Sequence, residues 1–223
     1  MRATRRPVPF WDAVIKVGGS LYRSASLDQL LRRLATAARR HRLLVIPGGG
    51  PFADAVRAIW RKHHLSERCT HRMALLGMDQ FGLLLCDLEP RAVAVQTLAE
   101  ACRAARSGKL PVLLAARLSA ASPELPASWE VTSDSVAAWV AARAGARRLI
   151  LIKSVDVRRM VEEAGPRSAA AVTAKSLAAS GVVDRAFPRF ASPRVDAWVV
   201  DGRRPASVAS ALAARPRAAV RIY

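Results

Sequence analysis

Short apolar runs alternate with longer amphipathic segments along the whole chain. The short runs have the length of β-strands, and the segments between them space apolar residues three and four positions apart, as an α-helix does. Strands that alternate with helices are typical of a mainly parallel sheet covered by helices. We therefore expect an α/β protein built as a three-layer α/β/α sandwich. The expected strands are 13–17, 43–46, 91–95, 112–115, 149–152, 197–200 and 219–222.

Helices are expected between these strands, and the first is the most clearly marked. Ser26 stands where a capping side chain is needed, and Gln29 follows it at the spacing of a capping box. An apolar face then runs from Leu27 to Ala38. The later helices are expected at about 52–64, 70–87, 97–107, 134–144, 174–180 and 205–214.

Glycines and prolines mark the ends of these elements. Gly145 and Gly181 stand where a helix commonly ends on a left-handed residue. The segment 116–130 contains two prolines and is expected to be a loop, as is the segment 162–168.

The length and composition indicate a single domain. At 223 residues and 52% apolar content, the chain can bury a large core. We expect one domain over residues 1–223 with two lobes, at about 11–130 and 131–223. No apolar run approaches the ~20 residues that span a bilayer, and the basic start lacks the apolar segment of a secretory signal. A cytoplasmic protein is therefore expected.

The net charge is +19, carried mostly by arginine, which raises the question of a polyanionic partner. The arginines are scattered along every segment, and aromatic residues are too few to form stacking platforms. Nucleic acid is therefore not expected as a partner, whereas the charge favours phosphorylated small molecules. Three cysteines and four histidines show no metal-ligand spacing, so no metal-ligating residues are expected.

Two of the predicted strands end on glycines. In "VIKVGGSLY" Lys16 lies inside an apolar run that breaks on Gly18 and Gly19, and "LLVIPGGGPF" ends on Gly48 to Gly50. A strand, a glycine-rich turn and a helix together aim backbone N–H groups at an anion. Glycines at strand ends also serve ordinary turn geometry, so each turn alone leaves that alternative open. Neither a P-loop nor a dinucleotide fingerprint is present.

A third polar group stands at the entrance of an apolar helix, in "WEVTSDSVAAWVA". Asp134 there is suited to an ordinary N-terminal cap. The alternative is that its carboxylate holds cationic side chains over a phosphate.

In this order and spacing, the three elements resemble the amino acid kinase family. Its K-x-G-G-S start is similar to Lys16 to Ser20, its second glycine run to Gly48 to Gly50, and its later S-D helix entrance to Ser133 and Asp134. The closing "VVDGRRPASVASAL" resembles the family's last strand, turn and helix, so the resemblance covers essentially the whole chain. It implies the amino acid kinase fold, ATP and Mg²⁺ as cofactors, an N-terminal acceptor-binding lobe, a C-terminal nucleotide-binding lobe and a homo-oligomer.

Within the family, "IPGGGPFADAVR", "HRMALLGMDQFGLLL" and "GVVDRAFPRF" resemble the branch that phosphorylates [5-(aminomethyl)furan-3-yl]methyl phosphate in methanofuran or methylofuran biosynthesis. Two alternatives stay open. One is a kinase of another acceptor, such as isopentenyl phosphate, uridylate or an amino acid carboxylate. The other is a non-catalytic subunit of the same fold that binds a polyanion or a partner protein.

The resemblance also implies roles for individual residues. Lys16 would contact the transferred phosphoryl group, and Asp134 would orient it together with a second cation, either Lys153 or Arg189. Asp79 and Gln80 are polar residues among leucines of a predicted helix, so Asp79 is a candidate for recognising the amine of the acceptor, and an exposed helix face is the alternative. The implied nucleotide-binding residues are Lys16, Gly18, Gly19, Ser20, Ser154 and Asp156. The implied acceptor-binding residues are Gly48, Gly49, Gly50, Asp54, Arg57, His71, Asp79, Gln80 and Ser133.

One segment departs from the family pattern. Many relatives read T-D-V-D-G-x-Y after the strand that follows the Asp134 helix, whereas this chain reads "LIKSVDVRRMVEEAG". Val157 stands where the glycine is expected, and no tyrosine follows.

Overall fold

A computed structural model describes residues 10–156, 159, 172–212 and 219–223. Its core is one seven-stranded sheet in the order β3-β4-β2-β1-β5-β6-β7, parallel except for the antiparallel pair β6 and β7. The mainly parallel sheet predicted from the alternating pattern is therefore confirmed. The strands are β1 (Ala13–Val17), β2 (Leu43–Pro47), β3 (Ala92–Val95), β4 (Leu110–Leu113), β5 (Arg148–Lys153), β6 (Asp196–Asp201) and β7 (Ala219–Ile222).

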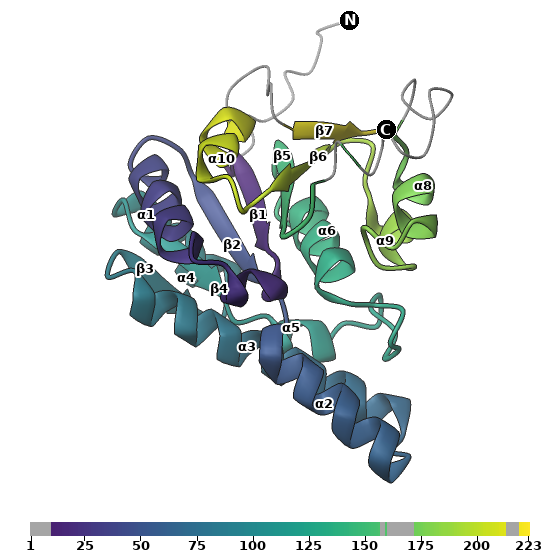
Figure 1. Cartoon of the computed structure of the whole chain (residues 1–223). Helices are drawn as coiled ribbons and strands as arrows, with labels where there is room; N and C mark the ends of the chain where they lie inside the picture. The colour runs from purple at the N-terminus through teal and green to yellow at the C-terminus, as the bar shows by residue number, and fades with distance from the viewer. Residues whose placement is uncertain (1–9, 157–158, 160–171, 213–218) are drawn as a thin grey trace, which may run out of the picture.

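Helices cover both faces of the sheet, which completes the three-layer sandwich (Figure 1). The helical pair α2–α3 extends beyond the edge of the sheet at which β1 ends. The helices are η1 (Gly19–Arg23), α1 (Leu27–Ala38), α2 (Gly50–His63), α3 (Glu67–Leu88), α4 (Leu98–Arg106), α5 (Ala116–Ala120), α6 (Ser133–Arg143), α8 (Ala174–Ala179), α9 (Phe187–Phe190) and α10 (Pro205–Leu212).

Two apolar cores lie on opposite faces of the sheet, because successive side chains of a strand point to opposite sides. Val14 of β1 packs in the core with α6, whereas Ile15 packs in the core with α1. Every residue of β1 and β2 is buried. A central parallel strand that is covered on both faces explains the continuous apolar runs in the sequence.

Several predicted details of the helices can be checked. Gly145 and Gly181 follow α6 and α8 with positive φ angles of 61° and 72°, as expected. The predicted capping box at Ser26 is wrong: its side chain makes no cap, and its hydroxyl instead hydrogen-bonds to the Ser24 hydroxyl at 2.7 Å and to the Gly202 carbonyl at 3.4 Å. These partners compete with the helix for the Ser26 hydroxyl.

The two predicted loops have different outcomes. The segment 116–130 is not entirely a loop, because it begins with the short helix α5. The predicted loop 162–168 lies outside the described residues, as does Val157.

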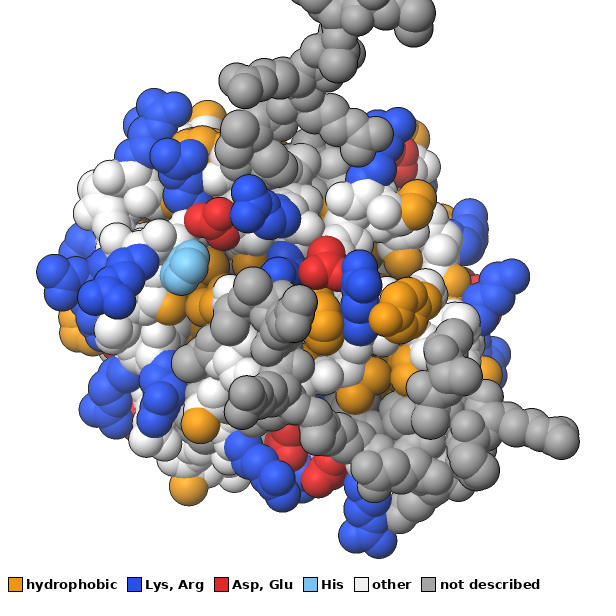
Figure 2. Space-filling view, turned by 90° about the horizontal axis from the view of Figure 1, so that it is seen from above, with side chains coloured by type: hydrophobic (Ala, Val, Ile, Leu, Met, Phe, Trp, Pro, Cys, Tyr) orange, Lys and Arg blue, Asp and Glu red, His pale blue; other side chains and the backbone are white. Residues whose placement is uncertain are grey.

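Positive charge is distributed over the surface. Figure 2 shows lysine and arginine side chains spread over one face of the molecule, with fewer acidic ones among them. No described helix has the length and apolar character needed to cross a membrane.

Candidate active site

The two glycine-rich turns lie in direct contact. Strands β1 and β2 are adjacent and parallel, with Val17 beside Pro47, so the turns that follow them meet at one edge of the sheet. A Cβ atom added to Gly19 would lie 2.1 Å from the Gly50 nitrogen. One added to Gly48 would lie 2.4 Å from the Gly19 nitrogen. The contact leaves no room for a side chain at either glycine, so close approach is one physical reason for these runs.

The second turn leads directly into helix α2. The 14-residue helix has proline at its start, where the missing N–H costs no hydrogen bond. The first N–H groups of a helix have no partners within the helix, and the helix dipole makes that end attractive to anions. Gly49 and Gly50 line a cavity at this end.

Lys16 is buried in β1 because a carboxylate is paired with it. The Nζ atom of Lys16 lies 2.9 Å from Oδ1 of Asp134, and Nζ of Lys153 lies 2.5 Å from Oδ2 of the same residue. The pairing of β1 with β5 places Lys16 and Lys153 on neighbouring strands, and Asp134 lies in the first turn of α6. We call these three residues the Lys–Asp–Lys triad. Two ammonium groups and one carboxylate leave it with one net positive charge.

Burial and charge act on the triad in opposite directions. Burial disfavours ionisation of Asp134, but the charges of Lys153 and Lys16 outweigh it and lower the pKa of Asp134 to about 2. For Lys153 burial is the larger effect, and together with repulsion from Lys16 it lowers the pKa to about 8 despite the attraction of Asp134. Asp134 is therefore ionised at neutral pH, whereas Lys153 holds its proton less tightly than a free lysine.

The start of helix α6 is held by a residue from a distant segment. The Asp184 carboxylate accepts hydrogen bonds from the backbone N–H groups of Thr132 and Ser135, at 3.1 and 2.9 Å. It also accepts from both hydroxyl groups of these residues. Thr132 occupies the N-cap position but makes no cap with its own side chain. Because Asp184 satisfies the helix end, Asp134 is not needed as a cap and can pair with the lysines.

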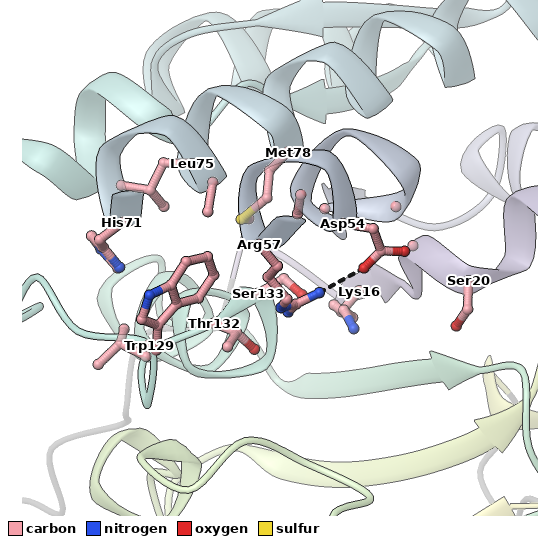
Figure 3. Close-up of a pocket in the computed structure, with 16 residues that line it drawn as sticks. Lys16, Ser20, Asp54, Arg57, His71, Leu75, Met78, Trp129, Thr132 and Ser133 are labelled. Atoms are coloured by element: carbon pink, nitrogen blue, oxygen red, sulfur yellow. Dashed lines mark hydrogen bonds and ion pairs between the residues drawn. The ribbon is translucent and has the colours of Figure 1, made fainter. Parts of the chain in front are cut away.

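A cavity of about 240 Å³ opens beside Lys16 and the two turns (Figure 3). Its walls come from β1, η1, α2, α3 and the segment that leads into α6. The lining residues are Lys16, Gly19, Ser20, Gly49, Gly50, Ala53, Asp54, Arg57, His71, Ala74, Leu75, Met78, Trp129, Val131, Thr132 and Ser133.

Polar and aromatic side chains of α2 contact Trp129 of the facing loop. Arg57 donates a hydrogen bond of 2.7 Å to Asp54, and its guanidinium lies 5.5 Å from the centre of the Trp129 ring. Trp129 also packs on Trp60, with ring centroids 5.4 Å apart. Its Nε1–H is buried and has no hydrogen-bond partner among the described residues.

His71 stands at the opposite end of the cavity from Ser20, next to Trp129 (Figure 3). Only 7% of its surface is exposed, and its Nδ1 atom lies 3.0 Å from the carbonyl oxygen of Ser128. Burial lowers the pKa of His71 below its usual value. Leu75 and Met78, one and two helical turns further along α3, add an apolar surface.

Some of the residues predicted to bind the nucleotide lie near Ser20, at the other end of the cavity. The Ser20 and Ser154 hydroxyls share a hydrogen bond of 2.8 Å, so the first glycine turn contacts the segment after β5. Gly18 packs so closely on β5 that a Cβ atom would lie 2.7 Å from the Ile152 carbonyl oxygen. Asp156 lies 3.8 Å from the Arg204 guanidinium.

Among the predicted site residues that do not line the cavity are Asp79, Gln80 and Arg189. Asp79 lies outside it, because its carboxylate accepts a hydrogen bond of 3.1 Å from the Ala116 N–H at the start of α5; burial raises its pKa to about 6. Gln80 is exposed on α3. Arg189 is exposed on α9, whereas Lys153 pairs with Asp134. Of the two candidates for the second cation, the geometry favours Lys153.

Sequence reasoning missed Asp184, Trp129 and Met78. Asp184 is one acid within the apolar stretch "GVVDRAFPRF", which is the signal that could have indicated it. Trp129 and Met78 carried no such signal, because aromatic and apolar residues most often belong to a core.

Comparisons with known proteins agree with this geometry. The sequence profile of the amino acid kinase family matches residues 13–160. The [5-(aminomethyl)furan-3-yl]methyl phosphate kinase of Methanocaldococcus jannaschii is 28% identical over 199 residues, which cover 87% of this chain and 90% of that enzyme.

Solved structures that share this fold include uridylate kinases. The enzyme from Archaeoglobus fulgidus has a TM-score of 0.64 at 18% identity. The match covers 92% of this chain and 97% of that enzyme. The UMP kinase of Ureaplasma parvum has a TM-score of 0.65 at 12% identity. The match covers 94% of this chain and 97% of that enzyme. The family profile spans most of the chain, and the fold agrees with it. The chain therefore belongs to the amino acid kinase family and is a phosphotransferase.

Proposed function

We propose that this kinase transfers the γ-phosphoryl group of ATP to a small phosphorylated acceptor, [5-(aminomethyl)furan-3-yl]methyl phosphate, as a step in the biosynthesis of a methanofuran-type cofactor. The observation that carries the proposal is the Lys–Asp–Lys triad beside two glycine turns in contact. The similar M. jannaschii enzyme, whose name gives this acceptor, supports the choice of substrate.

The proposed reaction needs no nucleophilic side chain. An oxygen of the acceptor phosphate attacks the γ-phosphorus of ATP, the bond from that phosphorus to the β,γ-bridging oxygen breaks, and ADP leaves with the electron pair. The product is a diphosphate. Such a transfer depends on positioning and on neutralising the charge of the moving group.

Each part of the site has a role in this proposal. Lys16 lines the cavity and would contact the transferred phosphoryl group, while Asp134 holds Lys16 and Lys153 in place. The first turn, with Ser20, Ser154 and Asp156, would hold the nucleotide. The second turn and the start of α2 would hold the acceptor phosphate, with Arg57 about two turns along the helix.

The donor set fits a nucleotide phosphate, because it combines ammonium groups, a hydroxyl and backbone N–H groups beside glycines that leave no space for a Cβ. No cluster of three or more metal-ligating side chains occurs among the described residues. Mg²⁺ fits this arrangement if it is held mainly by phosphate oxygens and water, as it is in many kinases. When bound, it would neutralise charge on the phosphate oxygens.

Two further features belong to the proposal. An enzyme that uses ATP and a small metabolite would work in the cytoplasm and would not need nucleic acid as a partner. We also propose a homo-oligomer, which is supported by the exposed leucines of α3, Leu76 and Leu83.

The test is product formation from ATP with four acceptors supplied in parallel: the aminomethylfuran phosphate, isopentenyl phosphate, uridylate and acetylglutamate. The furan substrate should give the highest kcat/KM. Arg57→Ala should raise the KM of each phosphorylated acceptor by roughly tenfold, since a charge-assisted hydrogen bond contributes about 1.5–3 kcal/mol. Lys16→Met provides the inactive control.

Preferred turnover of another acceptor would refute the substrate assignment. Absence of turnover with every acceptor by well-folded protein would refute the kinase proposal and favour a non-catalytic subunit.

A further inference from the structure

The end of the cavity away from the triad has a defined hydrogen-bonding character. His71 lines this end, and its Nδ1 atom lies 3.0 Å from the Ser128 carbonyl oxygen. A carbonyl oxygen only accepts hydrogen bonds, so Nδ1 must carry the proton. With its pKa lowered by burial, the ring is neutral, and Nε2 therefore presents a lone pair.

This lone pair is available to a ligand. No described residue donates a hydrogen bond to Nε2 of His71. Nε2 is also not fully buried. Because 93% of the residue is covered and its ring lines the cavity, the cavity is where Nε2 can meet another molecule. A group that binds there must donate an N–H or O–H.

The rest of this end is apolar or aromatic, apart from the buried Nε1–H of Trp129, which has no partner among the described residues. Leu75, Met78 and Trp129 form its walls, and Trp60 supports the Trp129 ring. Asp54 is the one acidic residue among the described residues of the lining, and it is paired with Arg57. Asp79, which the sequence suggested for the substrate amine, bonds to Ala116 outside the cavity. A donor on the acceptor therefore meets His71 and not a carboxylate.

We propose that His71 determines acceptor specificity, by accepting through Nε2 a hydrogen bond from a donor group at the end of the acceptor opposite its phosphate. This inference rests on the proposed function, in which that donor is the aminomethyl group. Trp129, Leu75 and Met78 then contact the ring between the donor and the phosphate. A substrate of this site is a flat phosphomonoester with an N–H or O–H donor at its far end.

The test compares two acceptors that differ in the donor alone: [5-(aminomethyl)furan-3-yl]methyl phosphate and the analogue with methyl in place of aminomethyl. The full-length wild-type protein should prefer the amine by roughly tenfold or more in kcat/KM, which corresponds to the loss of one hydrogen bond. His71→Ala should reduce this preference to about one, mainly through the amine substrate, and leave the KM for ATP unchanged.

Two conservative variants separate recognition of the acceptor by His71 from its support of the loop that contains Ser128. His71→Asn keeps a donor near the position of Nδ1, and so keeps the bond to Ser128, but it loses the acceptor at Nε2. His71→Gln keeps an acceptor near Nε2 and loses the bond to Ser128. We expect the Asn variant to lose the amine preference and the Gln variant to retain part of it. The exposed His63→Ala is the matched control and should behave as wild type.

The outcomes distinguish this inference from the proposed function. Equal kcat/KM for the two acceptors in the wild type would refute the role of His71 while leaving the kinase assignment intact. Loss of preference in the Gln variant but not in the Asn variant would show that His71 acts by holding Ser128. If the wild type turned over neither furan acceptor, the proposed function would itself fail.

Discussion

Single atoms decide the geometry where the two glycine turns meet. Gly50 has a φ of +54°, which disfavours residues with a side chain, and Gly19 lies against its nitrogen. The alternatives of turn geometry and anion binding are therefore not exclusive at this position. Glycine is required for the approach of the turns, and the approach brings their backbone N–H groups together.

The first prediction concerns this contact. Gly19→Ala should lower the free energy of unfolding by about 2 kcal/mol or more, because the new methyl group would overlap with backbone that cannot move away easily. Gly108→Ala is the control, since Gly108 has a φ of +73° but open space around it; about 1 kcal/mol is expected there. Urea unfolding of both variants measures the difference, and equal losses would contradict the prediction.

A second residue-scale prediction follows from Lys153. If its positive charge assists transfer, kcat should fall as pH rises through about 8, where the buried ammonium loses its proton. Lys153→Arg should have a lower maximal rate but no such fall, because guanidinium stays protonated. The measurement is kcat between pH 6.5 and roughly 9.5.

The pH dependence of stability provides a control for this pH profile of kcat. The native pKa of Lys153 lies below its usual 10.5, so between pH 8 and 10.5 the unfolded chain binds more protons at this residue than the native state. Stability contributed by this group therefore rises with pH in that window. A melting temperature that does not fall while kcat falls would assign the loss to chemistry, and an identical alkaline fall in the Arg variant would contradict the role of Lys153.

At the scale of elements, helix α6 depends on a segment some fifty residues away in the sequence. Asp184 accepts four hydrogen bonds at the start of the helix, which also carries Asp134. We expect Asp184→Ala to cost about 2 kcal/mol of stability and to lower kcat more than it raises KM, because the triad loses its alignment. Asp184→Asn should lose less stability and less kcat than Asp184→Ala.

Chemical denaturation and steady-state kinetics together test this prediction. Asp196→Ala serves as a control, since Asp196 on β6 pairs with Arg221 on β7 and with Arg148 on β5, both outside α6. A stability loss at Asp184 with unchanged kcat would show that the cap does not position Asp134.

The sequence predicted those parts of the site that are local in the chain. A lysine in an apolar strand and glycines after it indicated the two turns, and the carboxylate at a helix entrance indicated Asp134. It could not distinguish Lys153 from Arg189, because that choice depends on which strand lies beside β1. It misplaced Asp79 for a related reason: a polar residue on a helix can face a cavity or a neighbouring loop, and only packing decides.

At the scale of the whole molecule, the exposed leucines of α3 support the proposed homo-oligomer. Leu76 and Leu83 are each 52% exposed and lie seven residues apart, on one face of the helix. Replacing both with lysine should lower the molar mass measured by light scattering after gel filtration. Ile59→Lys, at a 41% exposed position on α2, is the control and should leave the mass unchanged. A monomeric wild type would refute the proposal.

The contact between the glycine turns has one more consequence. Because main-chain atoms of Gly19 and Gly50 set how closely the turns approach, the separation between donor and acceptor phosphates would be independent of the side chains around them. The far wall of the cavity includes the side chains of His71 and Trp129. Substitutions there could exchange one acceptor for another without altering the distance over which the phosphoryl group travels, so that this scaffold can acquire new substrates while keeping its chemistry.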